Sequence, residues 1–423
     1  RNLGEHRLEP GIHGLQFSCR GKPYYYMPTD AVTHSLMTMN QVFNYLAKRT
    51  GVAGQTNRIS RRVAIMRSLP TEYKIIRSFA CITYGREIHP LYRGYPVPVI
   101  MDRQAIHDCI VNSSAWIRDN MKPDGRFLYY YDGVKDSEVD FQHPGMTNPT
   151  YYNILRHSGG TITLLRAYEL AGDPTFLDRA VQSIDFFLTT VREHTYRGRF
   201  ACYPFYNRKS KLGGAGIGLV ALAHHYRLTG DRRFRKYMDG LVSHILSRVS
   251  ATGELIGYFI HPAYNGGKEL RDPDEKTKKE LFSFYYPGEA LLGLVLYLRH
   301  VPDIDPEVQA EILEKGRLAL DFLVHERPRK YHYLFQSLPS DGWLMQAIEE
   351  WVKIDGFRDQ AFADFVYGDA QAMIDHMYQE DDAPFFDYPG AFYYTFGEHA
   401  YPDGARCEGL MAAWYLARDL GDR

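Results

Sequence analysis

The chain has 423 residues, of which 45% are apolar and 24% are charged, which is ordinary for a globular protein. Its 50 basic and 51 acidic residues leave a formal charge of −1, and this balance argues against a nucleic-acid-binding protein, which needs a strongly basic face. No apolar run approaches the ~18 residues of a membrane span, and no signal peptide is visible, so the sequence predicts a soluble chain and leaves its compartment open.

The cysteines give no sign of a metal or disulfide framework. There are five, they are scattered, and no CxxC pair occurs, which indicates neither a zinc ribbon nor a disulfide scaffold. The glycines of residues 213–218 match a dinucleotide-binding motif only loosely and suit close packing at a helix start. No motif in the chain implies a metal ion or an organic cofactor.

Residues 1–100 are expected to form a small N-terminal α+β module. Apolar residues alternate over residues 14–26, a helical pattern covers residues 35–48, and two further strand-like stretches lie at 73–85 and 95–101. The function of this module cannot be read from its residues.

Residues 101–423 carry a repeat of helical hairpins. The segment Tyr168-Glu-Leu-Ala-Gly-Asp173 recurs as Tyr226-Arg-Leu-Thr-Gly-Asp231, and apolar residues follow each copy at helical spacing. Gly is typical of a helix C-terminus, and Asp is a favoured N-cap for the next helix. Looser copies of the turn lie near residues 303, 355 and 422. We therefore predict a mainly α catalytic domain in which five to six hairpins close into an (α/α) toroid.

Long aromatic connections lead into the inner helices of the predicted toroid. The chain has 33 tyrosines, many of them in clusters, and tyrosine rings can stack on sugars while their hydroxyls form hydrogen bonds. In a toroid, five helix starts would converge on one cavity. The candidate substrate-binding residues at these starts are Tyr152, Asn153, Arg156, Lys211, Tyr286, Trp343, His399, Asp403 and Arg406, and the candidate catalytic residues are Glu289, Asp341, Glu408 and His157.

Each candidate also has a purely structural interpretation. Glu289 and Glu408 fall in first turns of predicted helices, where a carboxylate complements the helix dipole. Asp341 suits an N-cap, and His157 suits a buried, hydrogen-bonded position. The recurrence of such residues at equivalent repeat positions is what favours a functional site.

The repeat resembles a known group of enzymes. The pattern Gly-Gly-x-x-x-Leu-Leu-x-Ala-Tyr-x-x-x-Gly-Asp-x-x-Phe-Leu at residues 159–177, with a copy near 213–235, resembles the (α/α)6-toroid carbohydrate-active enzymes. This group includes six-hairpin glycosidases, uronate lyases, and the N-acylglucosamine 2-epimerase and glucuronyl epimerase groups. The resemblance covers about residues 100–423, concerns the architecture and includes no family signature, so it transfers no catalytic residue. It implies an oligo- or polysaccharide substrate.

Several functions remain open within this resemblance. A glycoside hydrolase needs two carboxyl groups, which Glu289, Asp341 and Glu408 could supply; we favour it because carboxylates recur at three helix starts. A uronate lyase or C5-epimerase would use Arg156 and Asn153 on the sugar carboxylate, with His157, Tyr152 or Tyr286 as base. A 2-epimerase would need two opposed bases. The alternative from another class is a non-catalytic toroid that binds glycans or proteins, with no group of shifted pKa.

For the 2-epimerase, the candidate bases are His157 and His399. The oligomeric state, the sugar and its linkage cannot be read from the residues.

Overall fold

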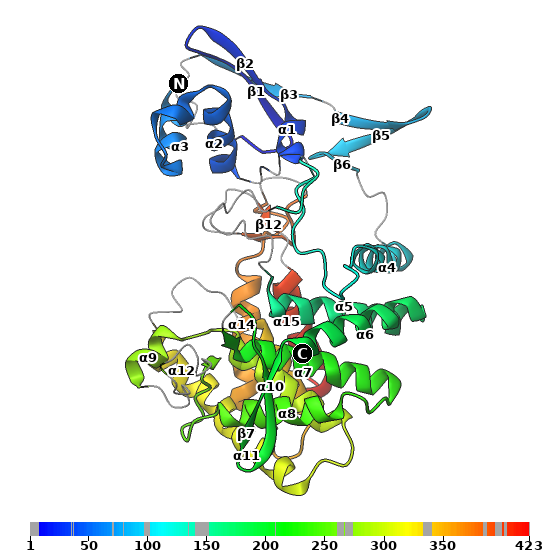
Figure 1. Cartoon of the computed structure of the whole chain (residues 1–423). Helices are drawn as coiled ribbons and strands as arrows, with labels where there is room; N and C mark the ends of the chain where they lie inside the picture. Colours follow the sequence, from blue (N-terminus) through cyan, green and yellow to red (C-terminus); the bar gives the residue numbers. More distant parts are fainter. Residues whose placement is uncertain are drawn as a thin grey trace. The chain divides into compact units, whose positions relative to one another are not determined.

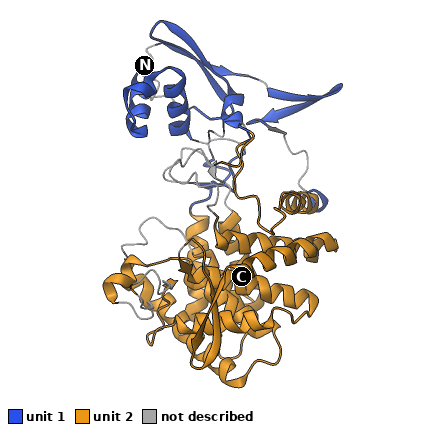
Figure 2. Ribbon diagram, viewed as in Figure 1, with its two compact units in different colours: residues 1–105, 133–135, 376–402 blue, residues 106–132, 136–375, 403–423 orange. Residues whose placement is uncertain are grey.

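A computed structural model gives the fold. It describes residues 8–34, 36, 38–69, 72–78, 80–96, 102–133, 135–139, 152–207, 209–259, 266, 274–332, 341–383, 387–393, 400–401 and 404–422. The chain divides into two units (Figure 2). Unit 1 comprises residues 1–105, 133–135 and 376–402, and unit 2 comprises residues 106–132, 136–375 and 403–423.

Unit 1 is built on a small antiparallel sheet. Its central strand β1 (His13–Cys19) pairs with β2 (Lys22–Tyr26) on one side and with β3 (Tyr73–Arg77) on the other. Alternate β1 residues such as Leu15 and Phe17 are buried against apolar residues of the neighbouring helices. Those helices are α1 (Pro28–Thr33), α2 (Met39–Arg49), η2 (Val52–Gln55) and α3 (Ile59–Ser68).

Further short strands complete unit 1. They are β4 (Ala80–Tyr84), β5 (Glu87–Tyr92) and β6 (Tyr95–Pro96), which form one sheet, and β11 (Phe392–Tyr393) with β12 (Ala400–Tyr401), which form another. The second pair comes from the far end of the sequence. A partly buried ionic cluster holds that segment to the N-terminal residues: Arg93 donates to Glu9 and, through Nε at 2.7 Å, to Asp387, while Tyr388 donates to Glu9.

Unit 2 consists of helical hairpins, and the mainly α fold predicted from the sequence is confirmed (Figure 1). The inner helices are α5 (Ile154–Ala171), α7 (Leu212–Thr229), α10 (Tyr286–His300), α13 (Gly342–Trp351) and α15 (Gly404–Leu420). The outer ones are α6 (Pro174–Thr189), α8 (Arg235–Ser247), α11 (Pro306–Asp321) and α14 (Gln360–Ile374). Each inner helix packs on the next in the order α5, α7, α10, α13, α15. Apolar residues bury α7 and α10 on nearly all sides, which is why these two helices lack a polar stripe.

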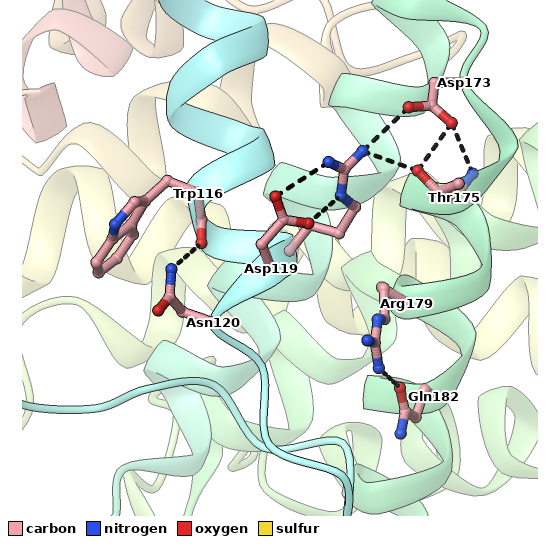
Figure 3. A network of polar contacts seen from close by, with 8 residues as sticks. Trp116, Asp119, Asn120, Asp173, Thr175, Arg179 and Gln182 are labelled. Carbon is pink, nitrogen blue, oxygen red and sulfur yellow. Dashed lines mark hydrogen bonds and ion pairs between the residues drawn. The ribbon is translucent and has the colours of Figure 1, made fainter.

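The first hairpin turn has the chemistry that the repeat predicts, whereas in the second copy Gly230 ends α7 but the N-cap of α8 is Phe234 and not Asp231. Gly172 ends α5 in the left-handed region, with φ of +68°, and the side chain of Asp173 caps α6 by accepting a hydrogen bond from the Thr175 amide. Arg118, on the preceding helix α4 (Arg103–Asp119), donates to the same Asp173 at 3.0 Å and to the Thr175 hydroxyl at 2.8 Å (Figure 3). The turn therefore also anchors α4 to α6.

The connections of unit 2 hold short elements. They are the hairpin of β7 (Val191–Tyr196) and β8 (Arg199–Pro204), the pair β9 (Ser210–Lys211) and β10 (Tyr258–Phe259), α9 (Glu275–Glu280), the π-helical turn η5 (Phe322–Glu326) and α12 (Arg327–Lys330). Among the helices that the structure describes, none combines the length and apolarity needed to cross a membrane.

Candidate functional site

The starts of the inner helices meet because glycines let them approach closely. A Cβ on Gly213, in the first turn of α7, would overlap Glu289 Oε2 and lie 2.7 Å from the Tyr286 ring. A Cβ on Gly288, in the first turn of α10, would lie 2.5 Å from the Leu344 amide nitrogen of α13. Gly342 in turn adjoins the start of α15, so the first turns of α7, α10, α13 and α15 form a continuous series.

Glu289 is the central carboxyl of this series. Its side chain is 5% exposed, and its Oε2 atom has no hydrogen-bond partner among the residues that the structure describes. Burial and the negative charge of Asp341 raise the pKa of Glu289 to about 8, with Lys211 acting in the opposite direction. At neutral pH the group is therefore mainly a carboxylic acid, with a proton that it can donate.

Asp341 is fully buried and occupies the N-cap of α13. One of its oxygens accepts a hydrogen bond from the Leu344 amide at 3.1 Å, and the other accepts one from Arg327 Nη1 at 2.8 Å. Burial raises the pKa of Asp341, whereas the Arg327 guanidinium and the amides of the helix start oppose that rise. Because both oxygens are engaged, Asp341 acts on its surroundings mainly through its charge.

Two functional candidates in this cluster were not predicted from the sequence. Arg327 pairs with Asp341 and also donates to the Phe284 carbonyl at 3.1 Å. Asp369, on the outer helix α14, accepts a hydrogen bond from the Asp341 amide at 2.8 Å, and burial raises its pKa to about 6. Neither residue stands at the start of an inner helix, so the repeat pattern gave no reason to select it.

One cation, Lys211, lies near Glu289, and a second, Arg156, acts on Lys211. Lys211 is the N-cap residue of α7, is half-buried, and its Nζ lies 5.9 Å from the centre of the Tyr286 ring. Arg156 is exposed in the first turn of α5 and donates to the Tyr129 hydroxyl at 3.3 Å. Burial, Lys209 and Arg156 lower the pKa of Lys211, while Glu289 opposes that shift.

Tyr152 and His157 form a separate buried cluster. Tyr152 accepts a hydrogen bond from the Phe127 amide at 2.9 Å, and its hydroxyl lies 2.8 Å from His157 Nδ1. The other ring nitrogen of His157 lies 2.8 Å from the Ser183 carbonyl, to which it donates. Burial lowers the pKa of His157 to about 4. Both of its nitrogens are thus occupied, which matches the structural interpretation better than a role as catalytic base.

The remaining predicted site residues have diverse positions. Asn153 caps α5 by accepting a hydrogen bond from the Leu155 amide at 3.0 Å. Trp343 is half-buried in the first turn of α13; in the first turn of α15, Arg406 is buried and Glu408 is exposed. His399 and Asp403 lie outside the described residues.

A pocket adjoins the carboxyl cluster. Its lining includes Pro287 of α10 and Arg327, the partner of Asp341, together with Glu254 and Tyr331. Glu254 is itself neutralised, because Lys330 donates to it at 2.8 Å and the Tyr331 hydroxyl donates to its other oxygen. Arg327 therefore connects this pocket to Asp341, although neither Glu289 nor Asp341 is among its lining residues.

Comparison with known proteins gives a likeness of architecture. No protein-family model matches the chain, and no curated protein matches it. A solved polysaccharide lyase has a TM-score of 0.46 at 15% identity and covers 74% of this chain and 85% of its own. An inactive variant of the GH76A α-1,6-mannanase of Salegentibacter sp. HEL1_6, in complex with α-1,6-mannotriose, has a TM-score of 0.45 at 12% identity, covering 75% of this chain and 99% of its own.

A third similar structure is a family 105 glycoside hydrolase of C. acetobutylicum ATCC 824. Its TM-score is 0.45 at 11% identity, and the match covers 74% of this chain and 92% of that one. All three belong to the carbohydrate-active enzymes that the repeat pattern resembles.

Proposed function

We propose that the chain is a carbohydrate-active enzyme, a glycoside hydrolase in which Glu289 is the general acid. The observation that carries this proposal is the state of Glu289: a buried carboxyl, protonated at neutral pH, with one oxygen lacking a partner among the described residues. Glycoside hydrolysis needs such an acid to protonate the leaving-group oxygen as the glycosidic bond breaks.

Burial, with the charge of Asp341 as a second cause, keeps Glu289 in its acid form. An ionised carboxylate nearby disfavours a second negative charge, and Asp341 is fixed by Arg327 and by the start of α13. Asp369 supports this arrangement through the Asp341 amide. These three residues therefore position and tune the acid without needing to touch the substrate.

The second carboxylate of the reaction is Glu408 in this proposal. It is exposed in the first turn of α15, and the start of that helix packs against Gly342 at the start of α13. An ionised carboxylate at this position would activate a water molecule or attack the anomeric carbon. Asp341 is less suited to that role because it is fully buried and both its oxygens are engaged.

The test is a screen of neutral and acidic oligosaccharides that detects reducing ends, 4,5-unsaturated products, and C5 or C2 inversion separately. We expect new reducing ends, and a kcat/KM that falls as the pH rises through about 8, where Glu289 loses its proton. Glu289→Gln and Glu408→Gln should each lose about 10²- to 10⁴-fold in kcat. Glu314→Gln, on the exposed side of α11, is the matched control and should keep full activity.

Other outcomes would assign the site differently. Unsaturated products would indicate a uronate lyase, and inversion without cleavage would indicate an epimerase. Saccharide binding without any turnover would favour the non-catalytic alternative. Full activity of Glu289→Gln on a cleaved substrate would contradict the proposal directly.

A further inference from the structure

Lys211 and Arg156 carry positive charges that no carboxylate neutralises within the described part of the chain. Three buried or partly buried cations of unit 2 pair with carboxylates: Arg327 with Asp341, Lys330 with Glu254, and Arg199 with Glu311. Lys211 and Arg156 instead lie against tyrosine rings, Lys211 against Tyr286 and Arg156 against Tyr129. A half-buried ammonium without a counter-ion is unfavourable for the folded protein on its own.

The carboxyl beside Lys211 does not compensate this charge. Glu289 is mainly protonated at neutral pH, so the pair brings almost no negative charge to the site. Its Oε2 atom is buried without a partner among the described residues and adjoins Gly213, two residues after Lys211. The helix starts of α5, α7 and α10 therefore combine two cations, two tyrosine rings and one proton donor.

We propose that this site binds an anionic saccharide, whose carboxylate or sulfate group pairs with Lys211 and Arg156. The inference rests on the proposed function for the identity of the site as a saccharide site. An anionic group provides the missing counter-charge, and a guanidinium and an ammonium are the donors that bind such groups in charge-assisted hydrogen bonds. The tyrosine rings beside the cations provide apolar faces for the sugar ring.

The experiment measures binding by calorimetry to the full chain carrying Glu289→Gln, so that no turnover interferes. The probes are hexuronate oligosaccharides, the same oligosaccharides with every carboxylate methyl-esterified, and a galactose oligosaccharide with and without its sulfate groups. We expect at least one acidic probe to bind about tenfold or more tightly than its neutral counterpart, and to bind more weakly at higher salt. Preference for the uronate or for the sulfate identifies which anionic group the site uses.

Substitutions in the same background locate the charge. Lys211→Met and Arg156→Gln should each weaken binding of the acidic probe about tenfold and leave the ester unaffected. Lys236→Met, on the exposed side of α8, should change neither. Equal binding of acid and ester, binding of neither, or an unchanged preference in both substituted proteins would overturn the proposal. Activity of the Glu289→Gln protein is measured separately, so failure of the hydrolase proposal is distinguishable from failure of this one.

Discussion

Glu289 combines a functional advantage with a cost to stability. Folding buries its carboxyl beside Asp341 and raises the pKa of Glu289 from 4.5 to about 8. The raised pKa supplies a proton donor at neutral pH. The same shift means that the folded chain holds a proton that the unfolded chain releases.

The consequence for stability can be measured. Because the folded pKa lies above the unfolded one, the stabilising effect of protonation is complete below about pH 4.5 and is lost as the pH rises through about 8. We predict that Glu289→Gln, which cannot ionise, becomes more stable relative to the wild type by up to about 1.4 kcal/mol for each pH unit in this window. Urea unfolding at pH 5, 6, 7 and 8 tests this, with Glu314→Gln as control. Parallel pH curves for wild type and Glu289→Gln would contradict it.

The sequence identified part of this cluster and could not identify the rest. Lys211, Glu289 and Asp341 were predictable because the hairpin repeat fixes where each inner helix starts, and these residues stand there. Arg327 follows a π-helical turn, and Asp369 stands in the middle of an outer helix. Their contact with Asp341 depends on tertiary packing between hairpins, which no local pattern encodes.

At the level of the helices, the glycines at the start of α7 decide how closely α10 can approach. The sequence suggested that these glycines serve close packing, and this prediction is confirmed: a Cβ on Gly216 would lie 2.5 Å from the Glu289 carbonyl.

Helix boundaries were less predictable. The helical pattern at residues 35–48 corresponds to a helix that begins only at Met39, because Thr38 and Gln41 form a capping box there.

Gly213→Ala tests whether this packing holds the candidate acid in place. The new methyl group would overlap Glu289 Oε2 and press on the Tyr286 ring, so we expect a loss of about 1–3 kcal/mol in stability and a fall in turnover. Gly368→Ala is the matched control, because that glycine is exposed in α14 with no atom near a Cβ. It should stabilise the chain by about 0.5–1 kcal/mol. The melting temperature and the turnover of both variants are measured against the wild type. A Gly213→Ala protein as stable and as active as Gly368→Ala would contradict the packing argument.

At the level of the whole chain, the two units are not successive segments of the sequence. Residues 376–402, between α14 and α15, belong to unit 1. Their strand pair is short and carries no repeat, so nothing in the sequence assigned them to the N-terminal module. What joins them to it is a partly buried polar cluster: Glu9, Arg93, Asp387 and Tyr388 come from three distant parts of the chain.

Arg93→Met tests whether this cluster holds unit 1 together. The substitution leaves the buried Glu9 and its neighbour Asp387 without their cation, so we expect unit 1 to lose about 3–5 kcal/mol, while Arg93→Met combined with Glu9→Gln should recover part of that loss. All four tryptophans (Trp116, Trp343, Trp351 and Trp414) lie in unit 2. The unfolding transition followed by tryptophan fluorescence should therefore occur at the same temperature as in the wild type. Calorimetry should show an additional transition at a lower temperature, from unit 1. Arg418→Met, which removes an exposed ion pair with Asp419, should shift neither signal measurably. A calorimetric trace of Arg93→Met that overlays that of the wild type would show that the attachment of residues 376–402 to unit 1 does not depend on this cluster.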